Sequence, residues 1–264
     1  MVKMSFLQRI VNLFFTPSKA FEGLGEGVSY KDWLYPLIIV TMGMIILPLV
    51  FRDVSINEAE ERFIRIERSL SNNPDIPEER LEQVNAGMRD AREKITDSRE
   101  HPFAFRNLWG YLLIPVMYFI SAAFFSAVLM LVGNFGMGGK VKFFQMFTMV
   151  ILTYLIGGNG FLMNMAPGVG TLELLVKAPL IAIKESTDMI FSPGLIFEEI
   201  DTYLKHFLNQ LDVFRIWGMV VMGFGFAKLY NKPTSSGIVA VGMPWLILVA
   251  IGAALVKANS LMMG

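Results

Sequence analysis

The charged residues leave long gaps along the chain, and these gaps predict where helices cross a membrane. A helix needs about 20 mainly apolar residues to cross the hydrocarbon core of a bilayer. Four uncharged gaps are long enough, and they lie between these pairs of charged residues: Asp32 and Arg52, Arg106 and Lys140, Lys142 and Glu173, and Lys232 and Lys257. A fifth run, Val213–Tyr230, corresponds to about 27 Å of helix, and Arg215 near its start can extend its side chain to the headgroups.

We therefore predict an all-α, polytopic membrane protein with five spanning helices. The spans are expected at about these residues: 33–51, 109–132, 143–164, 213–230 and 237–256. Together with their links they form a membrane domain of residues 32–52 and 107–264. Small residues spaced four apart let membrane helices pack closely. Two pairs have this spacing, Gly223 with Ala227 in the fourth span and Ala250 with Ala254 in the fifth.

The segment 53–106 is rich in charge and predicts a water-exposed domain. Its apolar residues recur at alternating intervals of three and four in two runs: Ile56, Ala59, Phe63, Ile66 and Leu70, then Leu81, Val84, Met88, Ala91 and Ile95. This spacing is typical of helices that pack along one seam, and "NNPDIPEER" between the runs supplies a turn. We expect an antiparallel helical hairpin outside the membrane. It either only spaces two spans or docks a partner through Phe63, Ile66, Leu81 and Val84.

Two further segments have the amphipathic pattern of helices at a membrane surface. In residues 1–31, a helix with one apolar face precedes Pro17, which starts a second short helix. In residues 168–211, the Ser192–Pro193 pair has the cap and first-turn pattern of another amphipathic helix. Residues 172–183 contain two charges and a proline, which favours a surface-lying or re-entrant helix over a sixth crossing.

Charge predicts the orientation and excludes one class of partner. Basic and acidic residues balance at 23 each, so no overall field would attract nucleic acid. The basic residues of the short segments fall on one side if the N-terminus is cytoplasmic: Lys3, Arg9, Lys19, Lys31, Lys140, Lys142, Lys228 and Lys232. We predict a cytoplasmic N-terminus, with the hairpin and the C-terminus outside.

Few residues offer chemistry. The chain has no cysteine, and its two histidines, His101 and His206, are far apart in sequence and fit no metal-ligand spacing. No acidic or basic residue lies deep inside a predicted span, where proton-coupled transporters and intramembrane hydrolases need such groups. We therefore predict no catalytic, cofactor or metal site.

Four polar residues in or beside the spans still need partners. Asn159 and Asn164 lie in the third predicted span, where they either bond between helices or line a substrate path. Asp212 and Arg215 are three residues apart and can meet on one helical face. They would serve as an anchor at the membrane boundary or as a functional ion pair.

Three stretches, "FFTPSKAFEGL", "GGKVKFFQMF" and "LDVFRIWGMVVMGFGFAKLYNK", resemble the Yip (Ypt/Rab-interacting protein) family of five-span membrane proteins, in its prokaryotic branch. The residues that carry the resemblance are Pro17, Gly138, Gly139, Asp212, Arg215, Trp217 and Gly225. It covers most of the chain outside residues 52–106. It implies a helical domain in a bacterial cytoplasmic membrane, with no known catalysis. Bacterial relatives look like accessory membrane subunits, some associated with ABC-type exporters, while eukaryotic relatives interact with Rab-type GTPases.

Together these features favour a non-enzymatic accessory or scaffold subunit of a membrane assembly, such as an ABC-type exporter. Its expected contacts are membrane lipids and protein partners. One alternative is a permease whose path passes Asn159 and Asn164. Another is a membrane-shaping or trafficking protein that acts through its interfacial helices.

Overall fold

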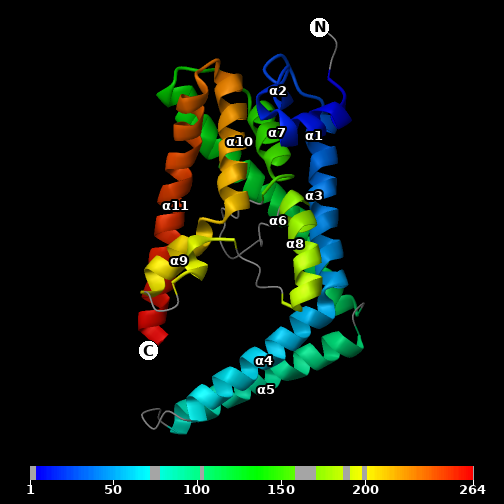
Figure 1. Cartoon of the computed structure of the whole chain (residues 1–264), viewed down its shortest axis with the longest axis vertical. Helices are drawn as coiled ribbons and strands as arrows, with labels where there is room; N and C mark the ends of the chain where they lie inside the picture. The colour runs from blue at the N-terminus through cyan, green and yellow to red at the C-terminus, as the bar shows by residue number, and fades with distance from the viewer. Residues whose placement is uncertain are drawn as a thin grey trace. The chain divides into compact units, whose positions relative to one another are not determined.

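The computed structural model describes residues 4–71, 78–101, 104–157, 171–186, 191–197 and 201–263 (Figure 1). Regular secondary structure in these ranges is entirely helical, which confirms the predicted all-α class. The helices in chain order are α1 (Phe6–Phe15), α2 (Pro17–Ala20), α3 (Tyr30–Val50), α4 (Arg52–Ser71), α5 (Glu78–Glu100), α6 (Phe105–Met130), the π-helix η1 (Leu131–Phe135), α7 (Phe143–Thr153), α8 (Thr171–Lys184), the 3₁₀ turn η2 (Pro193–Leu195), α9 (Thr202–Gln210), α10 (Val213–Tyr230) and α11 (Thr234–Met263).

The chain divides into two compact units, which are described separately below. The bundle unit comprises Met1–Met44, Ile114–Val176 and Ile190–Gly264. The hairpin unit comprises Ile45–Leu113 and Lys177–Met189.

Within the described residues, three helical segments are long and apolar enough to cross a membrane: Leu112–Phe135, Val213–Tyr230 and Thr234–Ala258. They coincide with the second, fourth and fifth predicted spans. The 21-residue helix α3 lies where the first span is predicted. Five crossings therefore remain a prediction, while the membrane character of the chain follows from these three helices.

The third predicted span, 143–164, is only partly accounted for. Helix α7 ends at Thr153, and a turn leads to Gly157, where a Cβ atom would lie 2.3 Å from the backbone oxygen of Phe214. A glycine at 157 thus allows the chain to pass against the start of α10. The prediction of one continuous helix missed this contact, and residues 158–164 lie outside the described residues.

Helices α10 and α11 pack side by side because small residues face each other (Figure 1). A Cβ on Gly237 would lie 2.2 Å from the Gly223 carbonyl oxygen and 2.7 Å from the Ala227 Cβ. Gly223 and Ala227 are therefore at a close helix contact, as their spacing predicts. The second predicted pair does not repeat this arrangement, because Ala254 is exposed in the structure.

At the N-terminus, Ser5 and Gln8 form a capping box that starts α1. Leu7, Val11 and Phe15 form an exposed apolar stripe, as expected for a helix at a membrane surface. Arg9 of the same helix is buried, with only 3% of its surface exposed.

The amphipathic helix predicted from Ser192 starts later in the structure. Pro193 begins only a single 3₁₀ turn, and α9 starts at Thr202, after Asp201 accepts a hydrogen bond from the backbone N–H of Tyr203 at 2.9 Å. The turn instead folds onto α9, where the Ser192 hydroxyl lies 3.2 Å from the Asn209 side-chain oxygen. This tertiary contact competes with helix formation.

Candidate functional site

Asp212 is a buried carboxylate that starts α10. Its Oδ1 accepts a hydrogen bond from the backbone N–H of Phe214, and its Oδ2 accepts one from that of Phe191, both at 2.9 Å. The backbone N–H of Val213 in turn donates to the Phe191 carbonyl at 3.1 Å. Asp212 therefore caps the helix and holds the preceding loop against it, a role that an aspartate before an apolar run can signal in sequence.

Arg215, one turn into α10, contacts α9. Its Nη1 donates to the side-chain oxygen of Gln210, and Gln210 lies 3.4 Å from the His206 ring. The Nε of Arg215 is buried, with no acceptor among the described residues. Burial lowers the pKa of His206, and the positive charge of Arg215 adds to this effect. Trp217 lies further along the same helix with part of its ring exposed.

The remaining residues that carry the Yip resemblance gather at the other end of α10. Pro17 is the first residue of α2, which packs against α10 (Figure 1). A Cβ on Gly225 would lie 2.6 Å from Met149 Cγ of α7 and 3.0 Å from Phe21 Cδ1, so this glycine admits both side chains. We call this region, formed by α1, α2, residues 136–142 and the last turn of α10, the loop end of the bundle.

The loop after η1 closes over the ring of Tyr230. The Tyr230 hydroxyl donates to the Asn134 side-chain oxygen at 2.8 Å, and the Val141 N–H donates to the same oxygen at 3.1 Å. Gly138 has φ +70, and a Cβ on Gly139 would lie 2.2 Å from the Tyr230 ring. Gly138 is explained by its left-handed backbone conformation, which glycine adopts readily, and Gly139 by the lack of room for a side chain beside Tyr230.

Two buried polar side chains that sequence reasoning did not select hold the N-terminal segment. Arg9 donates to the carbonyls of Ala20 at 2.6 Å and Glu22 at 3.3 Å. Burial lowers the pKa of the Arg9 guanidinium, and Asp32 acts in the opposite direction. From α7, Gln145 Nε2 donates to the carbonyls of Leu24 at 3.0 Å and Gly25 at 2.7 Å. Their polarity within apolar runs was the available signal.

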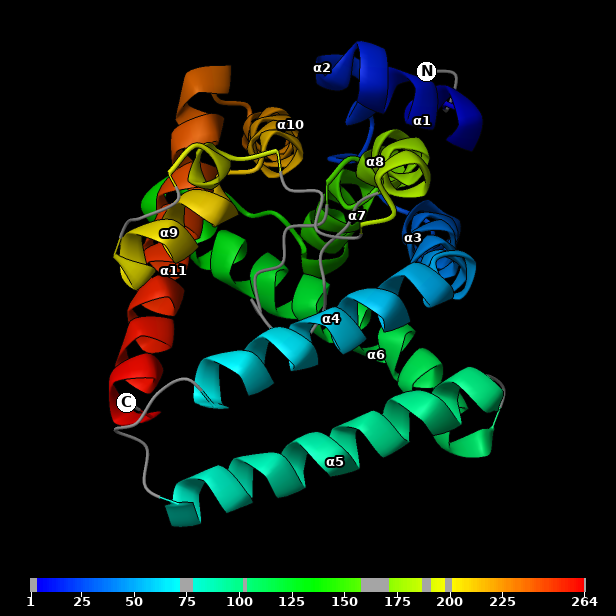
Figure 2. The same cartoon turned by 60° about the horizontal axis from the view of Figure 1, so that its bottom comes forward.

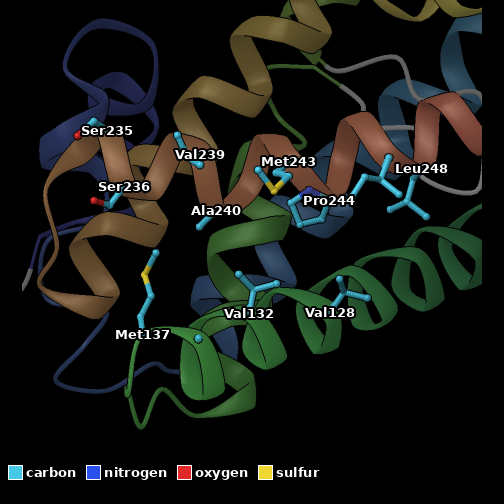
Figure 3. A pocket seen from close by; sticks show the side chains of 12 residues that line it. Val128, Val132, Met137, Ser235, Ser236, Val239, Ala240, Met243, Pro244 and Leu248 are labelled. Atoms are coloured by element: carbon cyan, nitrogen blue, oxygen red, sulfur yellow. The ribbon is translucent and has the colours of Figure 1, made fainter.

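The loop end also bounds an apolar groove. Met137 of the loop and Val132 of η1 form one wall, and α11 forms the other, from Ser236 to Leu248 (Figure 3). The groove has a volume of about 780 Å³ and lies entirely in the bundle unit.

Asn159 and Asn164, the candidate intramembrane polar site, lie outside the described residues. Among the residues that are described, no group of three or more His, Asp and Glu side chains is placed to hold a metal ion.

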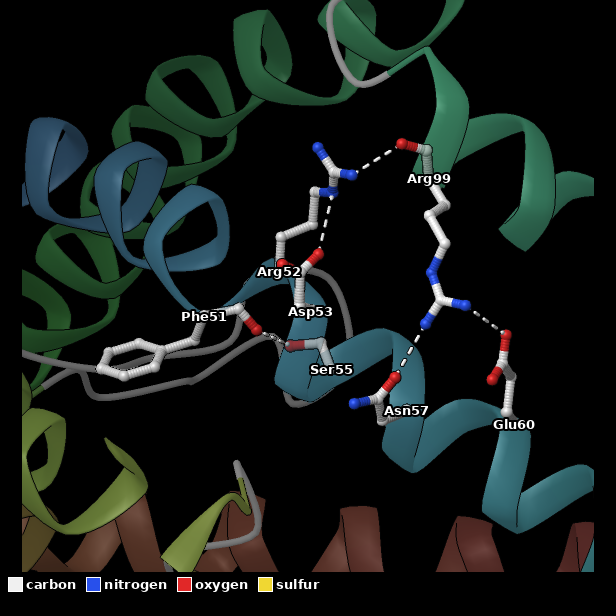
Figure 4. A network of polar contacts seen from close by, with 7 residues as sticks. All are labelled: Phe51, Arg52, Asp53, Ser55, Asn57, Glu60 and Arg99. Atoms are coloured by element: carbon white, nitrogen blue, oxygen red, sulfur yellow. Dashed lines mark hydrogen bonds and ion pairs between the residues drawn. The ribbon is translucent and has the colours of Figure 1, made fainter. Parts of the chain in front are cut away.

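In the hairpin unit, α4 and α5 run antiparallel, as predicted, and both views show them side by side (Figures 1 and 2). Ion pairs join them at two levels, with Arg92 Nη2 2.9 Å from Glu67 Oε2 and Arg99 Nη1 3.3 Å from Glu60 Oε1. Arg99 also donates to the Asn57 side chain at 2.7 Å (Figure 4). Exposed pairs of this kind each contribute only about 0.2–1 kcal/mol.

The base of the hairpin is joined by a further hydrogen bond. Arg52 Nη2 donates to the backbone carbonyl of Arg99 at 2.7 Å (Figure 4). Because Arg99 also contacts Asn57 and Glu60, this one residue of α5 connects three positions of α4. The register of the two helices is therefore specified most strongly near their base.

The apolar residues of the hairpin only partly follow the predicted seams. Phe63 and Val84 are half-buried, while the side chain of Leu81 lies outside the described set. Ile66, expected in the inward seam, is 45% exposed. Glu67 faces α5, and its neighbour Ile66 points about 100° away around the helix. Ile64 is 43% exposed as well, but it points about 200° away from Ile66 around the helix, so the two side chains lie on different sides of α4.

A polar groove lies between α4 and the C-terminal end of α8. Its volume is about 700 Å³, and side chains of both signs line it, among them Glu61, Arg62 and Lys184. Ser186 donates to Glu58 at 2.6 Å and fixes the edge of the groove. Such a mixed lining suits a charged peptide segment better than an apolar ligand.

No protein-family model matches the chain, and neither the curated proteins nor the solved structures include one that is significantly similar to it.

Proposed function

We propose that this protein is a non-enzymatic accessory or scaffold subunit of a membrane assembly of the Yip type, such as an ABC-type exporter. Its N-terminus would be cytoplasmic, in a bacterial cytoplasmic membrane crossed five times. The α4–α5 hairpin would extend outside and dock a protein partner.

The observation that carries this proposal is the surface of α4 in the hairpin unit. Isolated exposed apolar residues are common, but Ile66 lies on a strongly charged helix, one turn after Arg62, which lines the polar groove of about 700 Å³. Apolar anchors surrounded by charged side chains are typical of protein interfaces. The salt bridges to α5 hold this surface in one register, which lowers the entropy lost on binding.

The polar groups of the bundle unit support the non-enzymatic part of the proposal. Asp212, Arg9 and Gln145 are buried, and each bonds backbone groups that would otherwise lack a partner. Their chemistry is used to hold loops and helix ends. These residues therefore have a structural role that requires no substrate.

The test is purification in mild detergent from cells of the source organism, followed by identification of the associated chains. Deleting residues 56–98 is expected to remove a specific partner while the membrane bundle stays folded. Ile66→Lys should weaken the same association, and Ala86→Lys, on an exposed position of α5, serves as the matched control. If the deletion variant retains every associated chain, the docking function is wrong.

A further inference from the structure

The groove between α6–η1 and α11 is apolar along its length and polar at one end. Along α11 the residues that line it recur one helical turn apart, from Ser236 through Val239 and Met243 to Leu248 (Figure 3). These positions span about 18 Å at 1.5 Å per residue. Val128 and Val132 form the facing wall. The result is a long apolar groove on helices apolar enough to cross a membrane.

The dimensions of the groove fit a flexible hydrocarbon chain. Its volume of about 780 Å³ lies within the range of about 300–1,000 Å³ that is common for small-molecule sites. Val239 and Met243 project into the space, which is compatible with an acyl chain lying between them (Figure 3).

The walls of the groove are held by contacts on their far side. Tyr230 and Val141 both donate to Asn134, which fixes the loop that carries Met137. The facing helix contains Pro244, whose nitrogen cannot donate to the carbonyl of Ala240 one turn earlier. Both walls of the groove therefore depart from a regular α-helix, one at the π-helix η1 and the other at Pro244. Such π-helices are frequent at functional sites. The groove is therefore built into the fold.

Positive charge and hydroxyl groups lie at one end of the groove. Ser235 and Ser236 line the mouth (Figure 3). Lys232 precedes Ser235 by three residues, and Lys140 follows Met137 by three, so each Cα lies within about 11 Å of the mouth. Both lysines are exposed and form no ion pair within the described part of the chain. Cations and hydroxyls together complement a lipid phosphate.

We propose that this groove binds one anionic phospholipid. An acyl chain lies along α11 between Val239 and Leu248, and the phosphate is held at Ser235, Ser236, Lys140 and Lys232. The site is independent of the hairpin and of the proposed partner. It places a structural lipid where α6 and α11 separate.

The test uses the full-length chain, purified in mild detergent, exposed to vesicles of phosphatidylglycerol or phosphatidylcholine, and examined by native mass spectrometry. We expect one phosphatidylglycerol to be retained per chain, with at least tenfold less phosphatidylcholine. Val239→Trp fills the groove and should reduce the retained lipid at least tenfold. Ile251→Trp is the matched control, because Ile251 is similarly exposed on α11, 51% against 58%, but does not line the groove.

A second measurement needs no bulky substitution. Adding phosphatidylglycerol to delipidated protein should raise the melting temperature of the wild type, and Lys140→Gln with Lys232→Gln should remove most of that increase. Equal lipid retention by the Val239→Trp and Ile251→Trp variants would overturn the proposal. So would equal retention of the two lipids, no lipid-dependent rise in melting temperature, or cross-links from residue 239 to a second polypeptide.

Discussion

Replacing Gly237 by alanine tests how closely α10 and α11 approach. The new Cβ would lie 2.2 Å from the carbonyl oxygen of Gly223, whereas ordinary contact begins at 3.4 Å. The shortfall is 3.4 − 2.2 = 1.2 Å. The obstructing atoms are a backbone oxygen and the Cβ of Ala227, and neither can rotate away. The two helices must therefore move apart along their whole contact.

The expected cost follows from two opposing effects. Forcing an extra methyl group into a well-packed contact costs about 1–3 kcal/mol. Alanine regains about 0.5–1 kcal/mol over glycine inside a helix. Because the overlap exceeds 1 Å against fixed atoms, the first effect dominates, and we expect a net loss of about 2 kcal/mol. At about 2–4 °C per kcal/mol, this lowers the melting temperature by about 4–8 °C.

The assay is thermal unfolding in one fixed detergent, followed by tryptophan fluorescence. Two control variants separate packing from helix propensity. Gly136→Ala and Gly87→Ala add a Cβ that meets nothing within 4 Å, so neither should be destabilised. A Gly237→Ala variant that melts at or above the wild-type temperature would refute the close helix contact.

Three further predictions concern helix capping, pH and topology. Asp212→Ala should lower the free energy of unfolding by about 1–2 kcal/mol because two backbone N–H groups lose their acceptor. Asp212→Asn keeps one side-chain oxygen and should be destabilised less. Equal losses of the two variants in thermal unfolding would contradict the capping role. Because the pKa of His206 is lowered in the folded chain, the unfolded chain takes up the proton first, and stability should fall as the pH drops through 6.5. His206→Gln should reduce this pH dependence. An unchanged pH profile in the variant would contradict the role of His206. Since the chain has no cysteine, the single variants Ile66→Cys and Lys140→Cys can be labelled without background. In intact cells an impermeant maleimide should reach only Ile66→Cys. Labelling of both variants would contradict the predicted topology.

Periodicity and charge were sufficient to predict the helices whose ends are set locally. Helix α10 has the predicted bounds because Asp212 caps its start and Asn231, with φ 50, ends it in a left-handed conformation. The two hairpin helices also follow from the two runs of heptad spacing, although not every residue of the runs is buried. In each case the signal lies within a few residues of the boundary.

Features that depend on distant contacts were not predictable in the same way. Arg9 is buried because carbonyls 11 and 13 residues away accept its hydrogen bonds, and the sequence around Arg9 does not show which groups these are. Ile66 is 45% exposed although its spacing places it in the apolar seam, while Glu60 and Glu67 of the same helix reach α5 through ion pairs. The early end of α7 likewise depends on the approach of Gly157 to Phe214.

The candidate residues were therefore predicted more reliably than their roles. Gly139 and Gly225 could be selected from the sequence, but only the structure brings Tyr230 against one and Met149 against the other. Asp212 could be selected as well, although its bond joins it to Phe191, which precedes it by 21 positions and lies before η2 and α9.

The most direct test of the docking role is photo-crosslinking in living cells from the position of Ile66. A photoreactive amino acid there is expected to form one covalent product with a second membrane-associated or external protein, and the same product should form from Arg62, one helical turn earlier and beside the polar groove. The account would be contradicted if neither position gave a product beyond the unlinked chain, so that both behaved like the control position Ile251, an exposed residue of α11 outside the hairpin.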